Sequence, residues 1–358
     1  MNVRGKIWSL PGDRPTPSQE SWLRGWDGLV SRDGDNHKQN KLVRMVVRMS
    51  RVLRRARYPA RRSKYANHLY SDRQHVILLA LRQHLGRPYR DFCDIMEVSA
   101  ALLGEIGLRR MPHWTTLHKF SKRAEVWRLE RLLLACVDEA GLRALDLAVD
   151  STGFGSTSAS EYYVRTIERR TGKRGRPPKN RKVRSYVKQT AAVETRTQLI
   201  VAVKFRKGPA NDSPDFVRVL RKVEQARQDV RVVVADKGYD AERNHEYVDA
   251  ALGARSVIPV RAADRPGIRI TGRHRRGQVR DFDRKGYNRR TMAETINSVE
   301  KRRMGDHVLA TGTAQRHKEL VFRALAYDVG RLEVLFLLII DVFYRGLFWA
   351  ALYTKLED

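Results

Sequence analysis

Five short apolar-rich segments in the second half of the chain predict strands, and two of them, Ala144–Val149 and Asp229–Ala235, alternate between apolar and polar residues. Alternation with a period of two is typical of strands that bury one face. The segments are Ala144–Val149, Val187–Ala192, Gln198–Phe205, Asp229–Ala235 and Ser256–Val260. Apolar residues at helical spacing predict three helices, which are Asp215–Arg227, Ala241–Leu252 and a last helix that carries Glu294. The chain beyond Arg143 is therefore predicted to be an α/β unit.

The order of these elements is more specific than their number. It runs strand, strand, strand, helix, strand, helix, strand, helix, which is the order of the ribonuclease H-like fold. The expected fold class is α/β, a mixed five-stranded sheet with flanking helices over residues 143–325.

The first 141 residues follow other patterns. Residues 1–40 are polar and aperiodic, which predicts an irregular arm. Residues 41–62 are strongly basic with one apolar stripe, which fits a helix along a phosphate backbone and equally a solvated helix facing the core. Five short helices are predicted after them, at Asp72–Leu85, Tyr89–Met96, Leu102–Gly107, Trp114–Lys122 and Val126–Glu139. We interpret residues 41–141 as a helical DNA-binding region.

The last part of the chain, residues 326–358, contains one long apolar run. Val334–Tyr353 has the length of a membrane span, but Asp341 and Arg345 interrupt it at the spacing of an intrahelical ion pair. Charges at the centre of a span are costly in lipid, so we predict a packing helix, with a membrane anchor as the alternative.

Composition points to a polyanionic partner. The chain has 71 Lys and Arg against 40 Asp and Glu, a formal net charge of +31. Such an excess is self-repelling unless nucleic acid is the normal partner. Cys93 and Cys136 are the only cysteines, which excludes a disulfide framework and a thiolate zinc site. The N-terminus has no signal-peptide core, so a cytoplasmic, nucleoid-associated protein without a membrane partner is expected.

Three acids stand where the predicted topology brings distant segments together. Asp150 ends the first strand, Asp236 ends the fourth, and Glu294 lies on the final helix. Ligands of open α/β sheets gather at the carboxyl ends of strands. Three such carboxylates are able to hold two Mg²⁺ ions about 3.5–4 Å apart, with Mn²⁺ as an alternative. Asp146 competes with Asp150, but about 13 Å of strand separates them, so only one belongs to the site.

The segment Tyr287–Lys301 adds cations and a phenol to that site. At about 100° per residue, Tyr287, Arg290, Glu294 and Lys301 fall on one face of a helix. This pattern indicates a metal-binding carboxylate flanked by groups that contact phosphates.

These residues resemble a known family. The runs LAVDSTG at Leu147–Gly153 and VADKGYD at Val234–Asp240, with the Tyr287/Arg290/Glu294/Lys301 spacing, are similar to the DDE transposases of the insertion-sequence four and five group. The resemblance implies that Asp150, Asp236 and Glu294 are the catalytic metal ligands, and that Tyr287, Arg290 and Lys301 hold the transposon end. Glu300 stands next to Lys301 where leucine is common in the family, and we expect its charge to weaken the local phosphate contact.

Two further basic segments are candidates for DNA contact. Arg174 and Arg176 lie in a run, GKRGRPPK, that resembles a minor-groove AT-hook, although a flexible loop contacting phosphates is the alternative. The segment Arg261–Arg290 is rich in arginine and is expected to lie beside the acids.

The resulting hypothesis is a DNA transposase that binds the inverted-repeat ends of an insertion sequence, then cleaves and transfers strands with metal ions. Because two ends must be brought together, a homodimer on double-stranded DNA is expected. The alternatives are a nuclease of the same fold without strand transfer, and a non-catalytic DNA-binding protein derived from a transposase.

Overall fold

A computed structural model describes residues 40–61, 65, 69–156, 186–261, 263 and 269–356, with the backbone alone from residue 340 onward. Residues 1–39 of the predicted arm, which ran to residue 40, and the basic segment with Arg174 and Arg176 lie outside the described residues.

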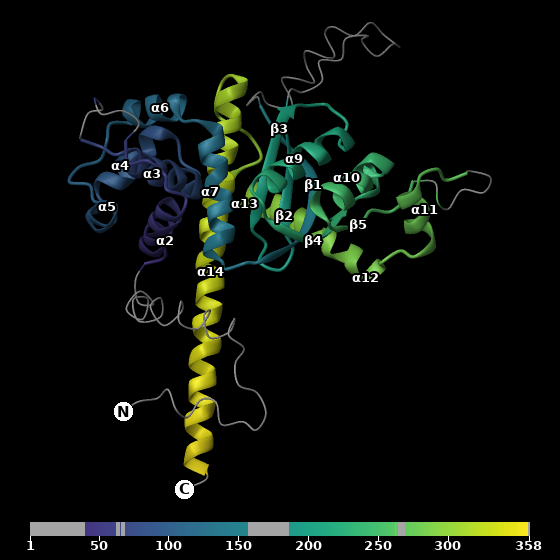
Figure 1. Cartoon of the computed structure of the whole chain (residues 1–358). Helices are drawn as coiled ribbons and strands as arrows, with labels where there is room; N and C mark the ends of the chain where they lie inside the picture. The colour runs from purple at the N-terminus through teal and green to yellow at the C-terminus, as the bar shows by residue number, and fades with distance from the viewer. Residues whose placement is uncertain are drawn as a thin grey trace, which may run out of the picture.

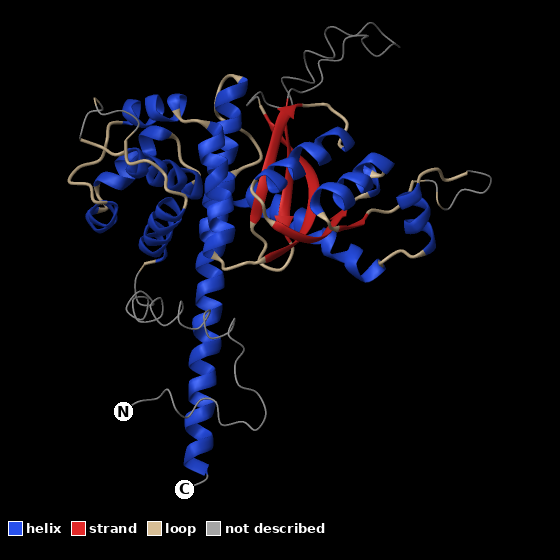
Figure 2. Cartoon of the chain, viewed as in Figure 1, coloured by secondary structure: helices blue, strands red, loops and turns tan. Residues whose placement is uncertain are grey.

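The centre of the second half is one sheet of five strands (Figure 2). The strands are β1 (Ala144–Gly155), β2 (Tyr186–Glu194), β3 (Ile200–Lys207), β4 (Asp229–Ala235) and β5 (Arg255–Val257). Their order in the sheet is β3-β2-β1-β4-β5, in which β1 pairs antiparallel with β2 and parallel with β4. This mixed sheet confirms the predicted ribonuclease H-like class.

Strand β1 is longer than predicted. Its parallel pairing with β4 ends at Val149, where the alternation also ends, but β1 continues to Gly155 through its pairing with β2. Asp150 therefore lies inside the strand rather than at its end. The pairing from Asp150 to Gly155 depends on partners in β2 that are 31 to 41 residues away in sequence, from Tyr186 to Ala191, and the local pattern does not contain that information.

Four helices surround the sheet and position the site. They are α9 (Ser213–Gln225), α10 (Glu242–Leu252), α13 (Thr291–Met304) and α14 (Thr313–Leu356). Helix α9 packs against β2 and β3, and α10 packs against β4 and β5. Helix α13 crosses β1 and β2, while α14 lies along the edge strand β3 (Figure 1).

The predicted N-terminal helices are confirmed with small shifts at their ends. They are α2 (Lys41–Arg55), α3 (Asp72–Leu85), α4 (Tyr89–Glu97), α5 (Ala100–Ile106), α6 (Trp114–Arg123) and α7 (Val126–Glu139). Helix α3 starts at a capping box between Ser71 and Gln74 and stops at left-handed Gly86, as its sequence dictates. Helices α2, α3 and α7 pack on α14, and their apolar residues join the same core as the sheet.

Helix α2 faces the core. Met45, Val46, Met49, Val52 and Leu53 are buried. Its basic side chains also have acidic partners, since Arg44 and Arg48 pair with Glu333 of α14 at 3.1 Å and Arg55 pairs with Glu139 of α7 at 2.9 Å. The core-facing alternative is thus the one that fits this helix.

Helix α14 begins at Thr313, so the boundary predicted between residues 325 and 326 falls inside a continuous helix. The carboxylate of Asp328, fully buried, accepts the backbone N–H of Ile200 on β3 at 2.8 Å. Among the helices that the structure describes, none contains a stretch long and apolar enough to cross a membrane.

Candidate catalytic site

Asp150 and Asp236 lie next to each other on neighbouring parallel strands. The register pairs Val149 of β1 with Ala235 of β4, and each aspartate follows immediately. Beyond Asp236 the chain turns into a 3₁₀ helix, η3 (Lys237–Tyr239), and the Asp236 carboxylate accepts the N–H of Lys237 at 2.7 Å. The two aspartates therefore occupy neighbouring positions at the carboxyl end of β4.

Helix α13 brings the third acid to the same place. It carries Glu294 in its first turn, and one turn further on Asn297 donates to the Asp150 carboxylate at 3.0 Å. Glu294 is half-exposed and forms an ion pair with Arg290. Asn297 is a functional candidate that the sequence reasoning missed, although its place three residues after Glu294 puts it on the same helical face.

The charge of Glu294 affects the pKa of Asp150. Burial, with a contribution from the charge of Glu294, raises the pKa of Asp150 above its usual value. The N–H of Ser151, the Asn297 amide and Arg290 oppose that rise by stabilising the ionised carboxylate. The site thus concentrates negative charge that cations have to balance.

The backbone that carries Tyr287 and Arg290 differs from the single helix that was predicted. The segment is interrupted: α12 (Arg284–Tyr287) is followed by a 3₁₀ turn, η4 (Asn288–Arg290), before α13 begins. The prediction of one continuous helix face was therefore wrong. Nevertheless, the Tyr287 hydroxyl lies 3.4 Å from the Asp236 carboxylate, and the Arg290 guanidinium lies 5.3 Å from the Tyr287 ring centroid.

Lys301 lies at the far end of α13. Its ammonium is 5.6 Å from the ring centroid of Phe154, which is on β1 beyond Asp150. The Lys301 ammonium therefore lies along the strand that carries Asp150, at the opposite end of α13 from Tyr287.

Glu300 does not act as predicted on its neighbour Lys301. Its side chain is 1% exposed and accepts a hydrogen bond from Gln189 of β2 at 2.9 Å. Burial raises the pKa of Glu300 to about 7, against the opposing influence of Gln189 and the nearby Arg323 and Lys301. The prediction of a weakened phosphate contact assumed an exposed charge, and this carboxyl group is in the core.

Asp146, the alternative to Asp150 as a metal ligand, binds two arginines. Its carboxylate accepts two hydrogen bonds from Arg231, at 3.0 and 2.9 Å, and one from Arg289 at 2.8 Å. Its role is thus to connect β1 to β4 and η4.

A hydroxyl cluster fixes the backbone beneath the acids. The Tyr239 hydroxyl, at the end of η3, lies 2.7 Å from the Ser151 hydroxyl, which is also 2.7 Å from that of Thr190 on β2. Burial raises the pKa of Tyr239 well above its usual value, so the phenol stays protonated. The cluster ties the turn that carries Asp236 to the strand that carries Asp150.

Part of the arginine-rich segment near the site has a structural role. Arg275 of α11 (Arg273–Arg280) donates twice to Asp240 at 2.8 Å, and Arg261 donates to the carbonyls of Lys237 and Gly238. Both arginines therefore brace the loop after Asp236 rather than point into free space.

The donor set suits hard divalent cations, which prefer carboxylate oxygens. Within the described residues, no three His, Cys, Asp or Glu side chains lie close enough as they stand to hold a metal ion. The half-exposed Glu294 is paired with Arg290. Its charge nevertheless contributes to the raised pKa of Asp150.

Comparison with known proteins agrees with this geometry. A family model described as Transposase DDE domain matches residues 142–329, slightly more than half of the chain. No curated protein matches. A similar solved structure is a piggyBac transposase synaptic complex with hairpin DNA, 10% identical, covering 82% of this chain and 73% of that chain at a TM-score of 0.37. A likeness at that score carries no weight for the site.

Proposed function

The chain belongs to the transposase DDE-domain family, and we propose from this premise that it is a DNA transposase that cleaves the inverted-repeat ends of an insertion sequence and joins them to target DNA. One observation carries the proposal. Asp150 and Asp236 lie next to each other where the pairing of β1 with β4 ends, and the helix that carries Glu294 contacts Asp150 there through Asn297.

Asp150, Asp236 and Glu294 would hold the divalent metal ions, two Mg²⁺ in our proposal, with Mn²⁺ as an alternative. Bound there, such ions activate an attacking oxygen and stabilise a leaving oxygen on phosphorus. Asn297 orients the Asp150 carboxylate, and η3 with its Tyr239–Ser151 contact holds Asp236 in register beside it.

The cations and the phenol would hold the DNA strand. Arg290 lies between Tyr287 and Glu294, so a phosphate that binds its guanidinium would release Glu294 to the metal site. Lys301 would contact a second phosphate along β1. In this proposal, the DNA strand has to bind Arg290 before Glu294 is free to join Asp150 and Asp236 as a metal ligand.

The reaction follows in two displacements. Water attacks the phosphodiester at the element end, and the freed 3′-hydroxyl then attacks a phosphodiester of the target. No covalent enzyme intermediate is needed. Residues 41–141 would recognise the ends, Arg174 and Arg176 would add backbone or minor-groove contacts, and a homodimer would bring both ends together.

The test uses purified protein, labelled element ends, a target plasmid and Mg²⁺. Products in which the labelled end is joined to the plasmid are expected. Cleaved but unjoined ends would indicate a nuclease of the same fold, and binding without cleavage would indicate a non-catalytic DNA-binding protein; either result contradicts the proposal.

A further inference from the structure

A cavity of about 500 Å³ lies between the helical region and the loop that leads into α14. Its lining residues come from α3, α4, α6, residues 309–311 and the first turns of α14. In Figure 1 the first turns of α14 are at the top of the long helix. It is separate from the three acids, and nothing in the proposed reaction uses it so far.

The floor of the cavity contains a buried cation with an unused donor. Arg82 is 5% exposed, and its guanidinium lies 4.1 Å from the centroid of the Tyr89 ring. One terminal nitrogen donates to the carbonyl of Arg87 at 3.0 Å, but Nε is buried and has no hydrogen-bond partner in the described part of the chain. A buried donor left unpaired is costly. Because Nε has almost no accessible surface, a ligand in the cavity meets Arg82 at its terminal nitrogens.

The rim adds aromatic faces and exposed cations. Trp114 is half-buried, with the exposed Arg90 guanidinium 4.9 Å from its ring centroid. His118 meets the Tyr89 ring edge-on at 5.6 Å, and Lys122 is exposed at the opening. Flat aromatic and guanidinium groups with cations beside them are the chemistry that stacks nucleobases and holds the attached phosphate.

The walls are fixed by hydrogen bonds, so the cavity is preformed. The Glu319 carboxylate accepts the N–H of Leu309 and of Ala310, the latter at 2.8 Å. Arg323 donates to the carbonyl of Gly305 at 2.8 Å and to Gln83, which also lines the cavity.

The same loop is joined to the strand that carries Asp150. Gly155 at the end of β1 donates to the carbonyl of Asp306 at 2.9 Å and accepts from the N–H of Val308 at 2.8 Å. Five residues of strand separate Gly155 from Asp150, about 16 Å at 3.3 Å per residue. One DNA strand is long enough to contact both places.

We propose that this cavity binds one unpaired nucleobase of the DNA, stacked against Trp114 and Tyr89, with an acceptor of the base on Arg82 and its phosphate on Arg90 or Lys122. The inference rests on the proposed function in that DNA is the ligand. It adds a contact with single-stranded DNA at a defined distance from the acids.

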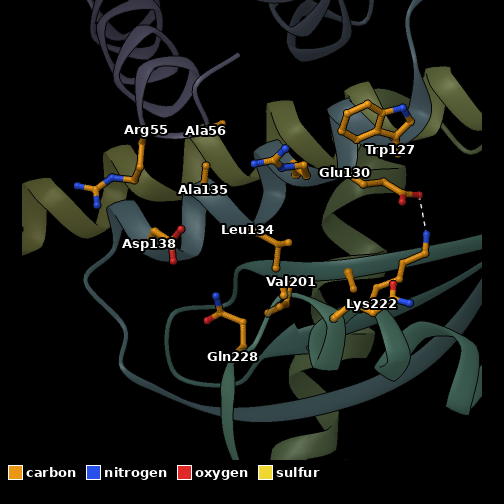
Figure 3. Close-up of a pocket in the computed structure, with 14 residues that line it drawn as sticks. Arg55, Ala56, Trp127, Glu130, Leu134, Ala135, Asp138, Val201, Lys222 and Gln228 are labelled. Atoms are coloured by element: carbon orange, nitrogen blue, oxygen red, sulfur yellow. Dashed lines mark hydrogen bonds and ion pairs between the residues drawn. The ribbon is translucent and has the colours of Figure 1, made fainter. Parts of the chain in front are cut away.

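A second cavity supplies the matched control (Figure 3). It lies between α7, α9 and β3 and has Trp127 at its edge, and two of its charged groups, Glu130 and Lys222, pair with each other at 2.7 Å. Trp127 is 52% exposed. Its replacement therefore removes an indole that is more exposed than Trp114 and lies outside the proposed site.

The experiment measures the affinity of the full chain for a duplex with a three-nucleotide single-stranded tail and for the same duplex with an abasic tail. Both probes carry the same number of phosphates. The wild type and Trp127→Ala are expected to prefer the tail with bases by about ten-fold, the scale of one base stacked on an aromatic ring. Trp114→Ala is expected to lose that preference and Trp114→Phe to keep most of it.

Equal affinity of the wild type for the two tails overturns the proposal. So does an equal loss in Trp114→Ala and Trp127→Ala, or a loss in Trp114→Ala that is the same for both probes. A urea unfolding midpoint for each variant separates misfolding from a lost contact. If Trp114→Ala does not fold, the tail preference of Trp114→Phe tests the proposal instead. Cleavage of element ends is assayed on the same preparations, so failure of the proposed function is seen independently of the tail preference.

Discussion

Asn297 connects the two halves of the candidate site, because its amide on α13 holds the carboxylate of Asp150 on β1. We expect Asn297→Ala to fold normally and to lower the rate of end cleavage about ten-fold, with a higher Mg²⁺ concentration needed for half-maximal rate. The reason is that Asp150 loses the hydrogen bond that orients it.

Thr295 provides the control, since it is exposed on the same helix and bonds only to the backbone of Thr291 among the contacts described. Thr295→Ala should cleave at the wild-type rate. If Asn297→Ala has an unchanged rate and metal requirement, Asn297 does not position Asp150.

Glu300 gives the protein a stability that depends on pH. Its pKa is about 7 in the folded state, against about 4.3 in an unfolded chain, so the folded protein binds the proton more tightly. Between those two values the unfolded chain loses its proton first, and the free energy of unfolding falls as pH rises. The penalty is complete above pH 7 and absent below about pH 4.

We expect Glu300→Gln to be more stable than the wild type at pH 8, by about 1–3 kcal/mol, and close to it at pH 5. Urea unfolding at the two pH values measures the difference. A Glu300→Gln protein that is equally affected at both pH values would show that the carboxyl group is not titrating in this window.

Among the elements, η3 has the most direct effect on the geometry of the site. Tyr239→Phe removes the hydroxyl that joins η3 to Ser151 and should cost about 1 kcal/mol of stability. Because Asp236 is in the same turn, cleavage should fall by more than the loss of folded protein accounts for. Tyr247→Phe, on α10, removes a hydroxyl that contacts Glu224 away from the acids and should leave cleavage unchanged.

A cleavage rate of Tyr239→Phe that equals the wild type after correction for the folded fraction would contradict this role. Measurement of initial rates beside a thermal unfolding curve gives both quantities.

Elements were predictable from the sequence where the periodicity is local. The helix at Asp72–Leu85 has the predicted ends because a capping box and Gly86 bound it, and the helix at Val126–Glu139 has them without a side-chain cap, in line with its apolar spacing. The extension of β1 and the break at η4 were not predictable, since each depends on packing with distant segments. The prediction that Asp150 and Asp236 lie on neighbouring strands followed from the topology, although Asp150 lies inside β1. Glu300 was misjudged because the residues next to it in the sequence do not indicate that its side chain is buried.

At the scale of the molecule, the helical region and the sheet share one core with α14 between them. Glu333 of α14 holds Arg44 and Arg48 of α2, and its side chain is only 4% exposed. Glu333→Gln would remove the negative charge that both arginines share, although Arg48 keeps its ion pair with Glu139 at 3.3 Å. We expect it to destabilise the protein by about 3 kcal/mol.

The unfolding transition should remain single, with fluorescence and circular dichroism coinciding, because the two regions are not independent. Glu130→Gln, which breaks the more exposed pair with Lys222, should cost less than about 1 kcal/mol. Two separate transitions in the wild type would show that the helical region folds as an independent unit.

The central claim is that Asp150, Asp236 and Glu294 act together on DNA, and one comparison tests it most directly. Glu294→Gln is compared with the wild type for binding and for Mg²⁺-dependent cleavage of element ends. Glu246→Gln, an exposed glutamate on α10, is the control. The account predicts that Glu294→Gln binds ends with nearly wild-type affinity and does not cleave, while Glu246→Gln does both. Cleavage by Glu294→Gln at a rate near that of the wild type would contradict the assignment of the site.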